Sequence, residues 1–169
     1  MKRFKVGLVG CGSISAQHLE ALKSSPYTDL TAVCDIREER AKVAAEKYEC
    51  KYYIDYRQML EEEGLDAVHI CTPHYLHSVI AIEAAEKGVN VLTEKPMSVT
   101  LQQADDMIEA CKNNQVTLGV IFQNRYNAGS QLIKKTLESG ELGKILSGQL
   151  SVYWYRSDEY YSSSDWKGT

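Results

Sequence analysis

The chain has 169 residues, of which 44% are hydrophobic and 25% charged, and its formal net charge is −4. This composition is ordinary for a globular protein, and the length suffices for one complete domain with a sizeable core. The acidic balance gives no reason to expect nucleic acid or an anionic membrane as a partner. No apolar run approaches the roughly 20 residues that span a bilayer, and the basic start leads directly into a strand rather than a signal peptide.

The first predicted strand, Val6–Val9, leads into a glycine-rich turn and then a helix. The turn reads Gly10-x-Gly12-x-x-Ser15, with Ser13 and Ile14 at the start of the helix. Gly10 suits the tight turn, and Gly12 lets the backbone approach phosphates without a Cβ in the way. The N–H groups of the first helical turn attract anions, so this segment predicts a pyrophosphate site. An ordinary strand-to-helix turn is the alternative, since such motifs are common.

The second predicted strand, Leu30–Cys34, ends at Asp35, about 20 residues after Ser15. At this spacing an acidic side chain accepts hydrogen bonds from the adenosine ribose hydroxyls of a dinucleotide. Asp35 favours NAD because a carboxylate repels a 2′-phosphate. Arg37 and Arg40 follow closely in the sequence, and they leave NADP as an alternative cofactor. Both arginines could equally lie on a solvated helix face.

Beyond Asp35, predicted helices and strands alternate. We expect helices over residues 37–48, 56–62, 77–87 and 100–114, and strands over residues 51–54, 66–71, 89–93 and 116–122. Apolar strands alternating with amphipathic helices predict an α/β fold, a doubly wound parallel Rossmann sheet covered on both faces. We assign this dinucleotide-binding domain to residues 1–124.

Polar residues follow the carboxyl ends of these strands. Thr72 and Pro73 follow the fourth strand, Glu94 and Lys95 the fifth, and Gln123 the sixth. In an open parallel sheet the ligand binds at this edge, so the clustering predicts a site there.

The pattern changes after residue 124. We expect a helix over residues 130–139, a turn over residues 140–143, and a strand over Ile145–Tyr155, where apolar and polar residues alternate. Alternation is typical of an antiparallel or mixed sheet. Residues 125–169 are therefore assigned to the start of a second, truncated α+β domain. Its lone strand should be poorly ordered or paired with another copy.

The five cysteines form no C-x-x-C pair and are odd in number. This supports neither a disulfide framework nor a zinc site, and it favours free thiols in the cytoplasm.

Several motifs resemble the Gfo/Idh/MocA family of sugar and polyol oxidoreductases. They are Gly10-x-Gly12-x-x-Ser15, Cys71-Thr-Pro-His-Tyr-Leu-His77, Glu94-Lys95-Pro96, Gln123-Asn-Arg-Tyr126 and the closing Asp165-Trp-Lys-Gly-Thr169. The resemblance implies NAD, or alternatively NADP, as cofactor, a small-molecule sugar or polyol as substrate, and a homo-oligomer formed through the C-terminal domain. Family members are longer, so we expect an N-terminal fragment that is inactive alone, with a catalytic Asp and His beyond residue 169.

The resemblance implies that Lys95 is the catalytic residue. Its ammonium would face the nicotinamide and hydrogen-bond the hydroxyl being oxidised, which eases the departure of the hydroxyl proton. A surface lysine beside a strand end is the alternative. Glu94 would orient Lys95 or contact the cofactor.

The resemblance also implies roles for residues in other turns. Thr72, Pro73, His77 and Gln123 would contact the cofactor, although a helix-start turn and a local hydrogen-bonding histidine are the alternatives for the first three. The residues implied at the substrate are Asn124, Arg125 and Tyr126, for which a polar interdomain loop is the alternative. We assign His18 to packing and see no signal in His69 or His74.

Two further functions stay open. One is a glycosidase of the same family that uses bound NAD for transient oxidation. The other is a non-catalytic regulator that binds a dinucleotide, which the intact Glu94-Lys95-Pro96 disfavours.

Overall fold

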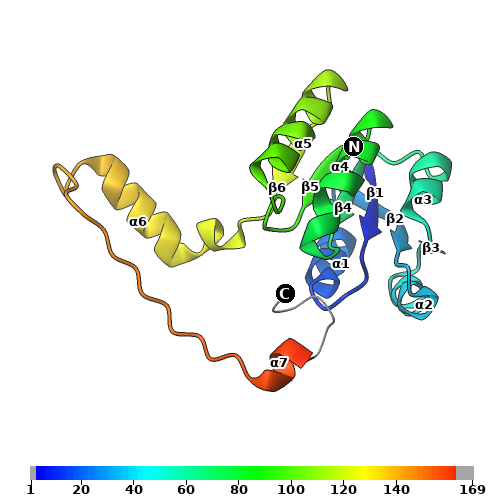
Figure 1. Ribbon diagram of the computed structural model, residues 1–169, viewed down its shortest axis with the longest axis horizontal. Helices are drawn as coiled ribbons and strands as arrows, with labels where there is room; N and C mark the ends of the chain where they lie inside the picture. Colours follow the sequence, from blue (N-terminus) through cyan, green and yellow to red (C-terminus); the bar gives the residue numbers. More distant parts are fainter. Residues whose placement is uncertain (1–2, 163–169) are drawn as a thin grey trace. The chain divides into compact units, whose positions relative to one another are not determined.

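The computed structural model describes residues 3–162, which form two compact units, one ending at Phe122 and the other beginning at Gln123. The strands of the first unit are β1 (Phe4–Val9), β2 (Thr28–Cys34), β3 (Lys51–Tyr53), β4 (Ala67–Ile70), β5 (Asn90–Thr93) and β6 (Leu118–Val120). Its α-helices are α1 (Ser15–Ser24), α2 (Glu38–Tyr48), α3 (Tyr56–Glu62), α4 (His77–Glu86) and α5 (Leu101–Asn113), and a 3₁₀ turn, η1 (His74–Leu76), precedes α4. Figure 1 shows the strands with these helices packed around them.

All six strands are parallel and lie in the order β3-β2-β1-β4-β5-β6. This order confirms the doubly wound Rossmann sheet. The chain reverses its winding direction between β1 and β4, which is where such sheets open a crevice for a ligand.

The core lies on both faces of the sheet because successive side chains of a strand point to opposite sides. On one face Leu8 and Val33 pack with Leu19 and Leu22 of α1. On the other face Ile70 packs among residues from α3, α4 and α5, which include the fully buried Met59, Ile80 and Met107. Figure 1 shows α4 and α5 side by side on the sheet. Each such buried side chain contributes roughly 1.5–3 kcal/mol of transfer free energy.

Local signals set the helix ends. The Thr100 side chain caps α5 by accepting a hydrogen bond from the Gln103 N–H, and the Asp55 side chain caps α3 by accepting one from the Arg57 N–H. Gly88, at φ +75°, follows α4 in the left-handed conformation that glycine adopts without strain. The elements match the sequence-based ranges to within a few residues at their ends.

The second unit contains η2 (Gln123–Tyr126), α6 (Ala128–Ser139) and α7 (Asp158–Ser162). The strand expected over Ile145–Tyr155 was wrong, because residues 144–157 have no regular structure. A strand forms only when its backbone N–H and C=O groups pair with a neighbouring strand, and the described part of this unit holds no other strand. The apolar side chains of the segment are accordingly exposed, with Leu150 at 88% and Trp154 at 71%.

Two further points concern the C-terminal region. The short helix α7 forms in a tail where no element was predicted. The closing motif Asp165–Thr169 lies outside the described residues. Within residues 3–162, no helix combines the length and the apolar character needed to cross a bilayer.

Candidate functional site

The strand register brings the polar turns to one edge of the sheet. Val9 is level with Cys34 on β2 and with Ile70 on β4, and Ile70 is level with Thr93 on β5. The residues that follow these strand ends are Gly10, Asp35, Cys71 and Glu94. Backbone hydrogen bonds continue across this edge, from the Gly10 N–H to the Cys34 carbonyl at 2.8 Å and from the Glu94 N–H to the Ile70 carbonyl at 2.9 Å.

Gly10 makes the sharp turn out of β1. Its φ is +97°, and a Cβ added there would lie 2.7 Å from the carbonyl carbon and oxygen of Cys71. Both the backbone conformation and the close approach of the neighbouring turn therefore require glycine at this position.

Gly12 differs, because a Cβ added there would meet no atom of the described protein within 4 Å. The space above it is open. The N-terminus of α1 adjoins this space, and no side chain of the described residues caps it. The Ser15 hydroxyl instead donates to the Gly12 carbonyl at 2.6 Å and tightens the turn. An open cradle of backbone beside a helix N-terminus fits a pyrophosphate.

Asp35 is held in a fixed orientation at the end of β2. One carboxylate oxygen accepts a hydrogen bond from the Cys11 N–H at 2.8 Å, and the other accepts one from the Arg37 N–H, also at 2.8 Å. A carboxylate has about four acceptor positions, so Asp35 keeps capacity for ribose hydroxyls.

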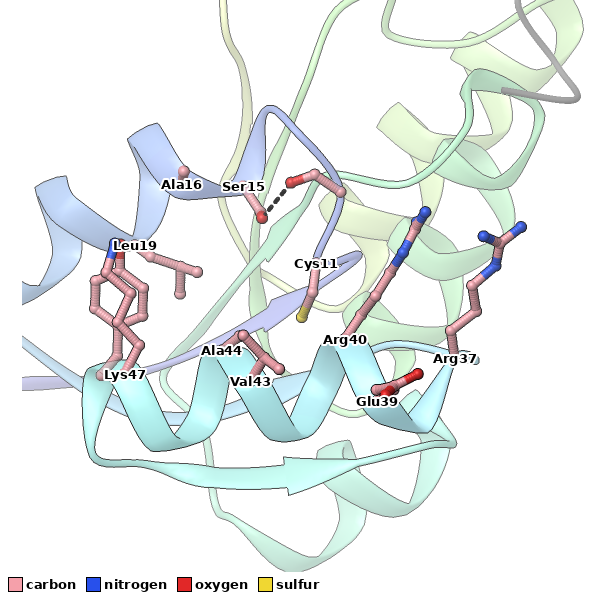
Figure 2. Close-up of a pocket in the computed structure, with 12 residues that line it drawn as sticks. Cys11, Ser15, Ala16, Leu19, Arg37, Glu39, Arg40, Val43, Ala44 and Lys47 are labelled. Carbon is pink, nitrogen blue, oxygen red and sulfur yellow. Dashed lines mark hydrogen bonds between the residues drawn. The ribbon is translucent and has the colours of Figure 1, made fainter. Parts of the chain in front are cut away.

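A pocket of about 450 Å³ lies between α1 and α2 next to the glycine turn. Figure 2 shows Arg40 of α2 and Arg37, which directly precedes the helix, projecting in the same direction, beside Cys11 of the turn. Burial, followed by the charge of Asp35, raises the pKa of the Cys11 thiol to about 12, so this cysteine stays protonated. The pocket lies on the Asp35 side of the edge, and Lys95 does not line it.

The turn after β4 holds Thr72, Pro73 and His77. The Thr72 hydroxyl oxygen is buried and has no hydrogen-bond partner among the described residues. A buried polar atom without a partner at a ligand edge fits a contact with a bound molecule. Pro73 directly precedes the 3₁₀ turn η1.

His77 faces the protein interior and is 0% exposed. Its Nδ1 lies 2.8 Å from the Pro96 carbonyl and its Nε2 lies 2.9 Å from the Thr72 carbonyl. Both ring nitrogens therefore face backbone carbonyl oxygens within the protein. As placed here, His77 links the turns after β4 and β5 rather than reaching a ligand, in line with the alternative of a local hydrogen-bonding group.

Glu94 and Lys95 follow β5, and the Lys95–Pro96 peptide bond is cis. The Lys95 side chain is exposed, whereas Glu94 is 6% exposed. Glu94 Oε1 lies 3.0 Å from Nε2 of His18 on α1, and Glu94 Oε2 accepts a hydrogen bond from the Lys95 N–H at 3.1 Å. His18 therefore does more than pack.

His69 completes this group, with its Nδ1 3.1 Å from Nδ1 of His18. Burial, and secondly His18, lowers the pKa of His69 to about 4, so the ring is neutral near pH 7. No role was expected for His69 from the sequence. A histidine between Val68 and Ile70 in a buried strand was nevertheless a signal, because a buried polar side chain needs a partner.

The remaining predicted residues lie in two places. Ser13 and Ile14 belong to the glycine turn and the entry to α1. Exposed side chains of η2 in the second unit include Gln123, Asn124, Arg125 and Tyr126. The group assembled at the sheet edge thus consists of first-unit residues. No set of three or more His, Cys, Asp or Glu side chains within the described chain is arranged to hold a metal ion.

Residues 4–122 match the family model described as an oxidoreductase family with an NAD-binding Rossmann fold. The myo-inositol 2-dehydrogenase of Thermotoga maritima is 34% identical over 141 residues, which is 83% of this chain and 42% of that protein. The chain therefore spans less than half the length of this curated relative.

Two solved structures extend the comparison. The WlbA dehydrogenase of Bordetella pertussis, in complex with NADH and UDP-GlcNAcA, superposes with a TM-score of 0.96 at 36% identity and covers 99% of this chain and 51% of its own. The myo-inositol 2-dehydrogenase of Lactobacillus plantarum superposes with a TM-score of 0.80 at 26% identity, over 85% of this chain and 43% of its own.

Proposed function

The chain belongs to the Gfo/Idh/MocA oxidoreductase family, and from this membership we propose that it binds NAD along the carboxyl edge of its sheet for hydride transfer with a sugar or polyol. One observation carries the proposal. The register assembles the open cradle above Gly12, the oriented carboxylate of Asp35 and the exposed ammonium of Lys95 at the same edge.

Each of these groups has a task in the proposed reaction. The glycine turn and the start of α1 bind the pyrophosphate, and Asp35 accepts hydrogen bonds from the adenosine ribose. NAD, when bound, supplies the acceptor for the hydride. Lys95 donates a hydrogen bond to the substrate oxygen and stabilises the negative charge that develops there as the hydroxyl proton passes to solvent. The Thr72 hydroxyl, buried and without a partner among the described residues, contacts the cofactor from the neighbouring turn.

We further propose that the substrate is a sugar carried on a nucleotide. The likeness to the Bordetella dehydrogenase bound to UDP-GlcNAcA extends over 99% of this chain, whereas the likeness to the Lactobacillus inositol dehydrogenase covers 85%. The substrate contacts would come from Asn124, Arg125 and Tyr126. Gln123, which precedes them in the chain, would contact the cofactor.

The cofactor is NAD rather than NADP in this proposal. The Asp35 carboxylate, held by two backbone N–H groups, cannot turn away from a 2′-phosphate without losing both hydrogen bonds. Without this carboxylate, Arg37 and Arg40 would favour NADP. Both arginines line the neighbouring pocket, and the charge of Arg40 acts on the pKa of Cys11 in the glycine turn.

The wider organisation is also a proposal. Residues 1–124 form the dinucleotide domain and residues 125–169 begin the substrate domain, through which the protein forms a homo-oligomer in the cytoplasm. All five cysteines lie within the described residues as free thiols, which supports a reducing compartment. The net charge of −4 supports small-molecule rather than nucleic-acid or membrane partners.

The test measures NADH formation with NAD and a panel of UDP-sugars, free sugars and inositols. It uses the 169-residue chain and, where the gene encodes more, the whole product. We expect turnover by the whole product on a UDP-linked sugar. Lys95→Ala should lower kcat by about 10²–10⁴ and leave the affinity for ADP-ribose, which lacks the nicotinamide, unchanged, whereas Lys112→Ala, a remote exposed lysine on α5, should change neither. Unchanged kcat in Lys95→Ala would refute the catalytic role, and sugar cleavage without net NADH formation would favour the glycosidase.

A further inference from the structure

A buried polar cluster lies beneath the proposed nicotinamide end of the site. It comprises His18 from α1, His69 from β4 and Glu94 after β5. His18 and Glu94 are 7% and 6% exposed. Water therefore has little access to either group, and each depends on protein partners for its hydrogen bonds.

The hydrogen bonds of Glu94 indicate which ring nitrogen of His18 faces it as the donor. Glu94 accepts the Lys95 N–H through Oε2, and an ionised carboxylate also accepts through Oε1, so Nε2 of His18 is the donor to Oε1. Nδ1 of His18 lies 3.1 Å from Nδ1 of His69, so one of these two nitrogens donates and the other accepts. With Nε2 of His18 as the donor to Glu94, each contact from His69 to His18 to Glu94 can pair a donor with an acceptor.

The other titratable groups near Glu94 do not replace His18. Burial, and secondly the charge of Glu94, raises the pKa of the Cys71 thiol, so Cys71 stays uncharged. Burial, then His77 and Lys95, lowers the pKa of His74, and Glu94 opposes this shift. Among the described residues, the ring of His18 makes the side-chain hydrogen bond to the Glu94 carboxylate.

The hydrogen bond between His18 and Glu94 affects Lys95 through the backbone. The Glu94 carboxylate accepts a hydrogen bond from the Lys95 N–H, and the Lys95 side chain is exposed to solvent at the ligand edge. Without a donor at His18 Nε2, the buried carboxylate would lack its side-chain partner and would be drawn out toward solvent or toward the Lys95 ammonium.

We infer that His18 is a positioning residue that acts through Glu94. Its Nε2–H holds the Glu94 carboxylate in place, and this carboxylate in turn holds the backbone N–H of Lys95. The contact thereby fixes the position from which Lys95 contacts the nicotinamide half of NAD. This inference rests on the proposed function. It extends the active site to a residue on the helix that begins at the phosphate turn.

The test compares two substitutions of similar size. His18→Gln keeps an N–H donor near the Nε2 position, whereas His18→Asn keeps polar atoms near Nδ1 but loses the donor to Glu94. Affinities for NAD and for ADP-ribose, which lacks the nicotinamide, are measured by calorimetry on the 169-residue chain. We expect His18→Gln to stay within about threefold of the unchanged chain for both ligands. His18→Asn should weaken NAD about tenfold and leave ADP-ribose within about twofold, because the phosphate turn is intact.

Equal NAD affinities of the two variants would overturn the inference, and so would a parallel loss of ADP-ribose binding. Long-range ¹H–¹⁵N NMR of the unchanged chain gives a second, independent measurement, and it should find the proton of His18 on Nε2. A bare Nε2 would refute the hydrogen bond whether or not the variants fold. Failure of the unchanged chain to bind NAD would instead overturn the proposed function, and the NMR result would then still decide the contact.

Discussion

Replacing Gly12 by alanine separates binding from folding in this domain. The backbone at Gly12 lies outside the left-handed region, and the added methyl would meet no protein atom within 4 Å. The free energy of unfolding should therefore stay the same or rise by about 0.4–1 kcal/mol, because alanine restricts the unfolded chain. The methyl group would occupy the space assigned to the pyrophosphate, so NAD affinity should fall at least about tenfold, or about 1.4 kcal/mol.

Gly10→Ala is the matched control, since it lies in the same turn. At φ +97° an alanine costs about 1–2 kcal/mol from its backbone conformation alone. Its Cβ would also lie 2.7 Å from the backbone of Cys71, which is itself hydrogen-bonded to Val9 at 2.7 Å, so the total loss should be about 3 kcal/mol. This corresponds to a Tm lower by roughly 10 °C.

The assay combines thermal unfolding with NADH fluorescence titration of all three proteins. We expect Gly12→Ala to keep its Tm and lose affinity, and Gly10→Ala to lose Tm. If Gly12→Ala bound NADH as tightly as the unchanged chain, the pyrophosphate would not lie over this turn. If Gly10→Ala kept its Tm, the close approach to Cys71 would be wrong.

Three further results are expected. Asp35→Asn should reduce the preference for NAD over NADP at least about tenfold, because it removes the charge that repels a 2′-phosphate; an unchanged ratio of the two dissociation constants would contradict this. His69 has a pKa of about 4 when folded, against 6.5 as its ordinary value, so the unfolded chain binds more protons between these values and stability falls as the pH drops from 6.5 to 4, by about 3 kcal/mol. His69→Gln should flatten that part of a urea-unfolding pH series, and an equal slope in both proteins would show that His69 does not cause it. The Cys11 pKa of about 12, against an ordinary 9.0, implies about a thousandfold less thiolate than an ordinary cysteine, so site-resolved alkylation at pH 8 should find Cys11 slow to react; rapid labelling would place it in a different environment.

Local sequence patterns predicted most of the first unit. Alternating strand and helix periods, the glycine turn and the caps depend on residues close in sequence, and the structure forms the corresponding elements over residues 4–120. The same pattern failed over Ile145–Tyr155, because a strand also requires a neighbour, and alternation alone does not supply one.

The sequence by itself determined the class of fold, the position of the glycine turn and the acid at the end of β2. These features follow from spacing within about 35 residues of chain, where the backbone geometry of strands and helices fixes which side chains fall together. The tertiary structure decided how buried polar groups are satisfied. His18 and Glu94 are 76 residues apart and meet only because α1 packs against β1 and β2 in a way that brings His18 to the residue after β5. His77, which the family motif suggested as a cofactor ligand, turns inward between two carbonyls for the same reason, since side-chain partners across elements depend on strand order and packing that no local pattern encodes.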